Sequence, residues 1–580
     1  MNPMNRRRFI QTSLGAGLGA ALVRTGAAST LPLTLPEAHR RMVQERHRRI
    51  VLQYDADDVL WKYWNLQRGR KASFERFRDA LFSYADEPGS QIDAIWWDIG
   101  GSPFGSPYPS KILPPHFHPL VRQWLDGGVD WVEQLVRATR SRKLEVFWNH
   151  RICEVECLID GGLTKEKLPL KVEHPDWVVP ATWWPQGMWN LAAPGLREYK
   201  ISVLRELAGR YDLDGIQIDF SRHLPCLPTG RQWELRDQVT EFMRMARQMI
   251  LEVAGQRGRP LLLAAKVPQN LAGCRVDGFD LRTWAEQGLV DVLTLGSRSM
   301  DVDVEGIRAA VGNDVQLQPC VDDHHASDGY RNPSIEGLRG IFANHFQRGA
   351  NSVVTFNWSF GPAQVCHSMG IDLGWPGGAA SGPPQAGLQS AGGVPAAQQV
   401  AYHEAGDPRT LAHKDKYFAV ERRGGYPWCD GYFNRNDDAP LPLALKSEQN
   451  PARLTLHISD SPTPGNSLFL RLILFQAHED DTFKVQLNGV ALTVSARDPE
   501  WKDPQILSPK PQPNSGGKGL YQGLFSVDPQ QRLLRLDCAA PREAWRRGQN
   551  EVTISVSSRR EIPATSPVHL EKLEAHLHYA

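Results

Sequence analysis

Between about residues 45 and 360 the chain repeats one pattern: a short apolar segment, a loop, and a segment with helical spacing. Alternating strands and helices favour parallel pairing through right-handed crossovers, and eight such strands predict closure into a (β/α)8 TIM barrel. The alternative is an open doubly wound sheet, but the sequence lacks the glycine-rich strand-to-helix loop expected of one. The predicted strands are 49–54, 92–98, 144–149, 214–219, 260–266, 290–295, 315–320 and 352–357.

A different pattern follows the barrel. Residues 374–398 are rich in Gly, Pro, Ala and Ser, which predicts a linker over 373–410 between a catalytic barrel at 31–372 and a second domain at 411–580. Short alternating runs separated by turns such as Asn488-Gly489 predict an all-β, jelly-roll-like sandwich there. Residues 548–554 resemble the closing strands of galactose-binding-like jelly rolls. Such domains bind sugar or brace a barrel, and the sequence leaves both roles open.

The first 30 residues resemble a twin-arginine export signal. Asn5-Arg6-Arg7-Arg8-Phe9-Ile10-Gln11 precedes a weakly hydrophobic, Gly/Ala-rich run that is too short to span a membrane. We therefore expect a periplasmic or extracellular protein with no membrane association after the signal is removed. Because twin-arginine export carries folded proteins, the eight cysteines need not form disulfides, and their positions show no paired framework.

Charge and aromatic content narrow the class of partner. The net charge is +1 without long like-charge blocks, which disfavours a nucleic acid partner. Tryptophan is abundant at 18 residues, and flat aromatic faces suit sugar rings, although any single tryptophan is more often part of a core. The oligomeric state is not indicated by the sequence.

Asp219 is the first candidate catalytic residue. Ile216, Ile218 and Phe220 alternate with Gly215, Gln217 and Asp219, so that one face packs on helices and the other points into the barrel. Asp219 then lies at the C-terminal end of its strand, where barrel enzymes place catalytic groups. The alternative is an aspartate that caps the next helix or pairs with Arg222.

Cleavage of a sugar bond requires a second carboxyl group. On the seventh strand, Gln316, Gln318 and Cys320 share a phase that brings Asp322 inward. Asp323 is its neighbour in the opposite phase, and a bulge would exchange the two. Glu154, and Glu156 beside it, follow the third strand and are further candidates for the acid.

Other polar groups lie at or just past strand ends. Lys266 ends the fifth strand in an inward phase, and an ammonium there requires a carboxylate partner. Long insertions follow the second and third strands, and the second carries four tryptophans, which makes it a candidate sugar-binding wall. The candidate substrate contacts are Trp97, Asp98, Asn149, Arg151, Trp184, Arg222, Lys266, Asp323, His324, Asn357 and Trp358.

Two histidine clusters suggest a metal-dependent hydrolase as an alternative. His116 and His118 lie in a loop, and residues 322–325 (Asp-Asp-His-His) lack the spacing that would aim their side chains at one ion. We expect no metal and no cofactor.

The segment Asp214-Gly215-Ile216-Gln217-Ile218-Asp219-Phe220, with Trp96-Trp97-Asp98 and Trp148-Asn149-His150-Arg151, resembles secreted glycosyl-hydrolase-like barrels loosely related to family-ten glycosidases. The resemblance covers residues 49–360. It implies an exported glycoside hydrolase with a carbohydrate substrate. Family-ten xylanases use two glutamates on the fourth and seventh strands, whereas both strands here end in aspartate. Barrels that cleave α-linked sugars resemble this one more closely at the fourth strand, and there a similar aspartate is the nucleophile. A sugar-binding protein without catalysis is the remaining alternative.

Overall fold

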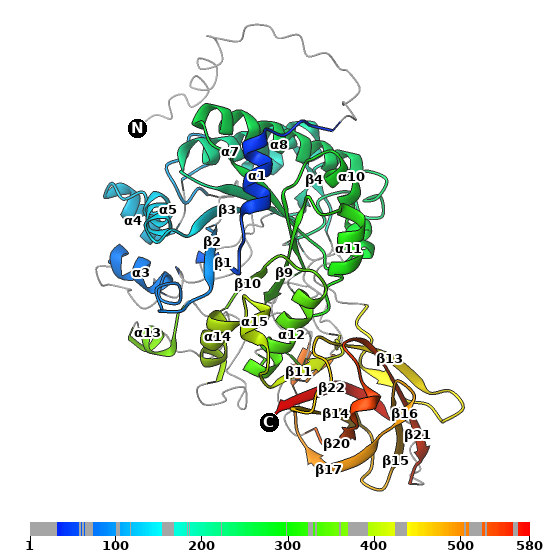
Figure 1. Cartoon of the computed structure of the whole chain (residues 1–580). Helices are drawn as coiled ribbons and strands as arrows, with labels where there is room; N and C mark the ends of the chain where they lie inside the picture. Colours follow the sequence, from blue (N-terminus) through cyan, green and yellow to red (C-terminus); the bar gives the residue numbers. More distant parts are fainter. Residues whose placement is uncertain are drawn as a thin grey trace, which may run out of the picture.

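The computed structural model describes residues 32–56, 60, 63, 73–99, 105–115, 118–153, 168–181, 184, 186–221, 223–296, 298–322, 329–330, 333–358, 361–368, 393–423, 438–503, 506–509, 525–527, 531–560 and 567–580. Figure 1 shows two bodies, a barrel ringed by helices and a smaller body of antiparallel strands beside it.

Eight parallel strands close into a barrel in the order β1-β10-β9-β8-β7-β6-β3-β2. This confirms the predicted α/β fold class, and all eight predicted strands are present. Two further short strands, β4 (Val178–Val179) and β5 (Met188–Trp189), pair with each other in the insertion after β3. The barrel strands are β1 (Ile50–Asp55), β2 (Ile92–Asp98), β3 (Glu145–Arg151), β6 (Gly215–Asp219), β7 (Leu262–Val267), β8 (Val292–Leu295), β9 (Gln316–Asp322) and β10 (Val353–Phe356).

Helices surround the barrel, and side-chain caps define where several of them begin. Ser73, Asp130, Asn270, Asp280 and Asp303 each accept a hydrogen bond from a backbone N–H in the first turn of the helix that follows. The surrounding helices are α1 (Glu37–Glu45), α3 (Phe74–Leu81), α4 (Pro119–Asp126), α5 (Trp131–Ser141), α6 (Pro169–Glu173), α7 (Pro194–Arg210), α8 (Arg236–Arg257), α9 (Leu271–Asp277), α10 (Leu281–Glu286), α11 (Val304–Val311), α12 (Ile335–Gln347) and α13 (Ala363–Ser368). Among the helices of these described ranges, none is long and apolar enough to cross a membrane.

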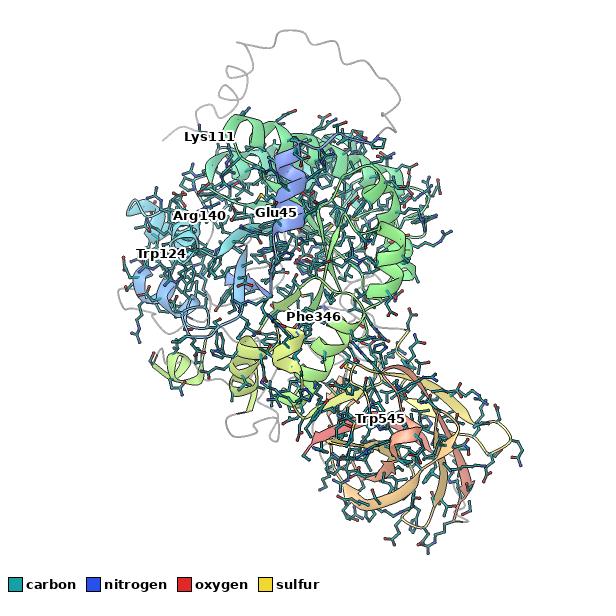
Figure 2. The ribbon with its side chains drawn as sticks, viewed as in Figure 1. Glu45, Lys111, Trp124, Arg140, Phe346 and Trp545 are labelled. Carbon is teal, nitrogen blue, oxygen red and sulfur yellow. The ribbon has the colours of Figure 1, made fainter. Side chains whose placement is uncertain are left out.

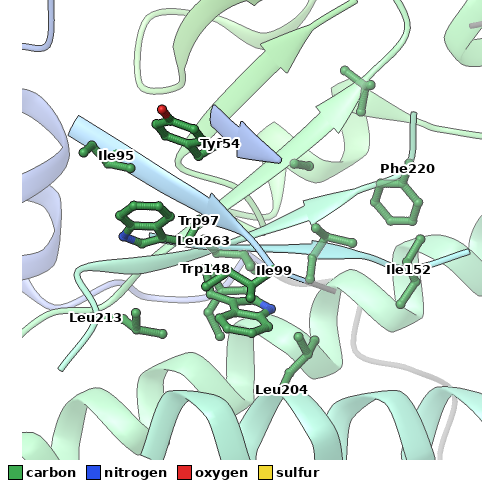
Figure 3. Packing of buried hydrophobic residues seen from close by; sticks show 14 of the residues in the cluster. Tyr54, Ile95, Trp97, Ile99, Trp148, Ile152, Leu204, Leu213, Phe220 and Leu263 are labelled. Carbon is green, nitrogen blue, oxygen red and sulfur yellow. The ribbon is translucent and has the colours of Figure 1, made fainter. Parts of the chain in front are cut away.

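The main core lies between the strands and the helices. Outward-facing strand residues such as Trp97 and Trp148 are buried there with Leu204 of α7 (Figure 3). This is the apolar face that the alternation predicts for each strand.

A second, smaller core fills the N-terminal half of the barrel interior. Trp96 and Phe147 stack with their ring centroids 4.2 Å apart, and Leu262, Val292 and Val354 belong to the same cluster. Below them Arg48 donates from Nε to Glu145 Oε2 at 2.6 Å, which closes this end with a buried ion pair.

Gly215 allows the Phe147 ring to pack against β6. A Cβ atom at residue 215 would overlap that ring and lie 2.8 Å from the carbonyl oxygen of Leu262. We expect Gly215→Ala to destabilise the protein by about 1 to 3 kcal/mol, because neither the ring nor the backbone has room to move. Urea unfolding measures this change.

The matched control is Gly209→Ala on α7, where a Cβ would meet nothing within 4 Å. That change should stabilise by roughly 0.5 to 1 kcal/mol through helix propensity. Equal effects of the two substitutions would contradict the packing argument.

The C-terminal domain consists of two antiparallel sheets that enclose one apolar core. Asn488 and Gly489 both have positive φ, 49° and 84°, as expected for the predicted two-residue hairpin turn. The larger sheet contains β11 (Lys416–Ala419), β12 (Leu443–Ala444), β14 (Asn466–Phe475), β17 (Thr493–Trp501), β20 (Leu533–Ala540) and β22 (His569–Tyr579). The smaller contains β13 (Ala452–Ile458), β15 (Thr482–Leu487), β16 (Val490–Ala491) and β21 (Gly548–Ser558). A separate pair is formed by β18 (Leu507–Pro509) and β19 (Phe525–Val527).

The predicted linker differs from the structure over its described part. Residues 393–411 form α14 (Gly393–Glu404) and α15 (Pro408–Leu411), and residues 369–392 lie outside the described ranges. The backbone N–H of Gln91, next to β2, donates to the carbonyl oxygen of Tyr402 at 2.7 Å. These helices therefore pack on the barrel.

The two domains are in contact. Asn344 of α12 donates to the carbonyl oxygen of His457 on β13 at 3.0 Å, and Ser299 donates to Glu421 Oε2 at 2.8 Å. In Figure 2 the labelled Phe346 of α12 lies between the body of the barrel and the sandwich that contains Trp545.

Candidate functional site

A layer of polar side chains occupies the C-terminal half of the barrel interior. It consists of inward-facing residues from six strands, and we call it the polar layer. Within it, hydrogen bonds run from Gln318 to Thr294, from Thr294 to Gln217 and from Gln217 to Asn149. The members of the polar layer are Gln53, Asn149, Gln217, Asp219, Lys266, Thr294 and Gln318.

Asp219 is fully buried and accepts four hydrogen bonds. Its Oδ1 accepts from the backbone N–H of Ser221 at 2.9 Å and from the Ser221 hydroxyl at 2.5 Å. Its Oδ2 accepts from Asn149 Nδ2 at 3.2 Å and from Gln53 Nε2 at 3.4 Å. The carboxylate is thus held from three segments of the chain.

Neighbouring cations keep Asp219 ionised. Burial opposes its charge, but the Lys266 ammonium, the two Ser221 donors and the Arg151 guanidinium outweigh burial, so the pKa of Asp219 lies below its usual value. Lys266 itself is buried, donates to Gln53 Oε1 at 3.2 Å and lies 4.0 Å from the centre of the Phe356 ring. Asp219 is therefore suited to act as a negative charge and not as a proton donor.

Asp98 and Arg151 form a buried ion pair beside this group. Arg151 Nε and Nη2 lie 2.9 and 2.7 Å from Asp98 Oδ2, and the Asp98 side chain is completely buried. Asp98 and Arg151 are the last residues of β2 and β3. The pair links the C-terminal ends of β2 and β3 next to Asp219.

We expect Arg151→Met to destabilise the protein by about 3 kcal/mol, because it removes a cation from the buried Asp98 carboxylate. The double variant Asp98→Asn, Arg151→Met should lose less than the sum of the two single variants, since the charge that Arg151 compensates is then absent. Denaturant unfolding of the four proteins measures the coupling. Simple additivity would mean that the two side chains act independently.

Asp322 points into the barrel at the end of β9, as its phase predicts. It is fully buried, accepts from Asn357 Nδ2 at 3.3 Å, and lies 3.8 Å from Arg298 Nη1. Asn357, directly after β10, adopts a left-handed backbone with φ of 56°, a conformation that asparagine tolerates better than most residues.

The charges of Asp322 and Asp219 both act on the Cys320 thiol. Burial raises the pKa of the Cys320 thiol to about 12, Lys266 opposes this increase, and Asp322 and Asp219 both add to it. All three charged residues therefore lie within electrostatic range of one thiol. The structure thus brings the two predicted carboxylates and Lys266 into the same part of the barrel interior.

The three candidate tryptophans lie elsewhere. Trp97 faces outward, packs on Tyr54 and Phe82, and donates its indole N–H to Thr139 Oγ1 at 3.0 Å. Trp358 donates to the carbonyl oxygen of Val321 at 3.1 Å, and Trp184 is buried in the same outer core. Their predicted role as flat surfaces for sugar does not fit these positions, because Trp97 faces the helices from β2 and the rings of Trp184 and Trp358 are buried in the outer core.

Several sequence-based candidates lie outside the described residues. They are Glu154, Glu156, Arg222, Asp323 and His324. Their described neighbours Cys153, Ser221 and Asp322 lie at the same C-terminal edge of the barrel. The proposed roles of all these residues stay predictions.

Sequence reasoning did not select three residues that contact the candidate carboxylates. Gln53 had a usable signal, since it is the one amide within the otherwise apolar and aromatic run 50–54. Ser221 had a weaker one, its position two residues after Asp219. Arg298 follows β8 in a loop and had no local signal.

The described residues contain one group of possible metal ligands, and it lies in the sandwich. His478, Glu479 and Asp480 offer ligand atoms within 4.8 Å of one another, but His478 already contacts Arg560 at 3.0 Å. His118, from one of the suggested histidine clusters, accepts a hydrogen bond from the Leu120 N–H as the cap of α4.

His150 is buried on the outer side of β3, and among the described residues neither ring nitrogen has a hydrogen-bond partner. Burial, with a contribution from Lys200, lowers the pKa of His150 to about 3. In the unfolded chain the His150 imidazole takes up a proton near pH 6.5, whereas in the folded protein it stays neutral at that pH. The contribution of neutral His150 to the free energy of unfolding is therefore fully present above pH 6.5, and it is lost as the pH falls toward 3.

Thermal melts between pH 7 and pH 4.5 test this effect. Each unit below pH 6.5 should cost about 1.4 kcal/mol through His150. His150→Gln should show a correspondingly shallower decrease. An unchanged pH dependence in that variant would mean that His150 binds its proton equally well in the folded and the unfolded protein.

Comparison with known proteins identifies no family. No family model matches the chain, and no curated protein matches it. Solved structures with a similar arrangement include α-L-fucosidase isoenzyme 2 from Paenibacillus thiaminolyticus, with 15% identity and a TM-score of 0.37 over 56% of this chain and 48% of that one.

Two further structures are similar at the same level. The PgaB (BpsB) glycoside hydrolase domain from Bordetella bronchiseptica has 12% identity and a TM-score of 0.36 over 54% of this chain and 94% of that one. An Anoxybacillus α-amylase has 12% identity and a TM-score of 0.36 over 89% and 99%. Likeness at this level assigns no activity.

Proposed function

We propose that this protein is a glycoside hydrolase that cleaves a glycosidic bond in a poly- or oligosaccharide by carboxylate chemistry. The proposal depends on the pair Asp219 and Asp322, which are both buried, inward-facing and at the C-terminal ends of barrel strands. Glycoside hydrolysis requires two carboxyl groups flanking one bond, and barrel enzymes build their sites at this end.

The ionised state of Asp219 supports its role in this reaction. The transition state carries positive charge near the anomeric carbon, and a fixed carboxylate stabilises that charge by attack or by electrostatics. Because Lys266 and Ser221 keep Asp219 charged, the proton for the leaving oxygen comes from another group. Asp322 and Glu154 are the candidates for that acid. Asn149, Arg151 and Lys266 would bind hydroxyl groups of the sugar.

Asp219→Asn should reduce the release of reducing ends from a susceptible glycan by at least about 100-fold. The substitution removes the negative charge that stabilises the transition state but keeps the shape of the side chain. Asp322→Asn and Glu154→Gln, measured in parallel, identify the acid. Asp237→Asn, at an exposed position in the first turn of α8, is the matched control and should keep full activity. Unchanged cleavage in Asp219→Asn would overturn the assignment. Product stereochemistry by proton NMR distinguishes attack by Asp219 from activation of water.

A sugar-binding protein without catalysis is the second candidate. It is favoured by the complete burial of Asp219 and Asp322, since a group that reacts must reach its substrate. A glycan panel separates the two: tight binding measured by calorimetry, with no reducing ends released from any glycan, would support binding alone.

We further propose that the protein is exported through its twin-arginine-type N-terminus. Replacing Arg6 and Arg7 by lysine should retain the protein in the cytoplasm, because the export machinery reads the arginine pair. Cell fractionation followed by immunoblotting measures the distribution. Normal export of the lysine variant would argue against this route.

A further inference from the structure

The loop that follows β8 brings Arg298 beside Asp322. The Arg298 side chain is buried, and its Nη1 lies 3.8 Å from Asp322 Oδ2. Asn357 Nδ2 donates to the same oxygen at 3.3 Å from the other side of β9. The place of the Asp322 carboxylate therefore depends in part on where this loop holds the guanidinium.

The two residues after Arg298 bind a carboxylate of the C-terminal domain. The Ser299 hydroxyl donates to Glu421 Oε2 at 2.8 Å, and the backbone N–H of Met300 donates to Glu421 Oε1 at 3.1 Å. Both oxygens of one buried carboxylate thus accept from one short stretch of the loop. Two such bonds fix the direction of the loop as well as its position.

Glu421 is itself held by the sandwich. The backbone N–H of the preceding residue, Val420, donates to the carbonyl oxygen of Leu573 on β22 at 2.9 Å. The following residue, Arg422, forms a buried ion pair with Glu571 of the same strand, with Nη2 2.5 Å from Oε2. Glu421 therefore extends toward the barrel from a fixed part of the second domain.

The barrel holds this loop further along the chain. Arg348, which follows α12, contacts Asp301 Oδ1 at 2.5 Å and donates to the carbonyl oxygen of Val302 at 3.1 Å. These contacts come after the stretch that Glu421 binds, so Glu421 is the anchor closer in sequence to Arg298.

We propose that Glu421 is a positioning residue for the hydrolysis: it holds the loop after β8 so that the Arg298 guanidinium lies beside Asp322. The inference rests on the proposed function, in which Asp322 is one of the two reacting carboxyl groups. A displacement of about 1 Å at such a group costs up to about 100-fold in rate. Loss of the anchor should therefore slow the reaction more than it weakens sugar binding.

Steady-state kinetics of the full-length protein on a susceptible glycan test this role. Glu421→Ala should lower kcat by about 10-fold and change KM by less than about 2-fold. Glu421→Gln should recover most of the lost kcat, since an amide can bind both the Ser299 hydroxyl and the Met300 N–H. The matched control, Asn344→Ala, removes another hydrogen bond between the domains and should keep full activity. Full activity in Glu421→Ala, with the expected loss in Asp219→Asn, would overturn this inference and leave the proposed function intact.

A double variant separates positioning from general support of the fold. Arg298→Met should also lower kcat, and adding Glu421→Ala to it should cause little further decrease, because Glu421 acts on Asp322 through Arg298. Losses that multiply in the double variant would mean that Glu421 acts by another path, which would overturn the inference.

Labelling of arginine by phenylglyoxal tests the loop without any glycan. The buried Arg298 should react slowly in the wild-type protein and several-fold faster in Glu421→Ala, as read by peptide mass spectrometry. Ser299→Ala, which removes one of the two contacts from the loop side, should change the labelling in the same direction and replaces Glu421→Ala if that variant does not fold.

Equal labelling of Arg298 in the wild-type protein and in these variants would overturn the inference whether or not any glycan is cleaved. If the wild-type protein cleaves no glycan, the catalytic role falls with the proposed function, and the labelling still shows whether Glu421 holds the loop. Failure of the anchor and failure of the proposed function are therefore distinguishable.

Discussion

A carboxylate removed from water must be compensated by neighbouring charges and donors, and Asp219 obtains this compensation from four parts of the chain. Gln53 on β1, Asn149 and Arg151 on β3, Ser221 after β6 and Lys266 on β7 all act on it. These strands can supply such groups only if the barrel closes with its observed register. The buried charge and the closed sheet therefore depend on each other.

The two halves of the barrel interior are filled by different kinds of side chain. The stacked rings of Trp96 and Phe147, with the Arg48–Glu145 pair below them, fill the N-terminal half with packed side chains. The polar layer lies in the other half, at the end of the barrel from which the β–α loops begin. The proposed chemistry lies at this end of the barrel.

Local periodicity explains how much of this could be predicted. The inward positions of Asp219, Asp322 and Lys266 followed from alternation within single strands, and the number of strands followed from the repeated strand–loop–helix pattern. The same alternation accounts for the misassigned Trp97, which is adjacent to the inward-facing Asp98, because one residue along a strand reverses the face. Arg298 reaches Asp322 from the loop after another strand, and no local sequence pattern encodes that approach.

Helix α14 changes where the barrel domain ends. Its Tyr402 hydroxyl lies 3.1 Å from Thr355 Oγ1 on β10, and Gln91 binds both Tyr402 and Gly406 through backbone and side-chain atoms. Residues that follow the last strand by nearly 50 positions thus cover the junction where the first and last strands meet. Any dissection of the protein into separate domains must keep the chain through Leu411 with the barrel, because a cut at residue 372 would leave that junction open to water.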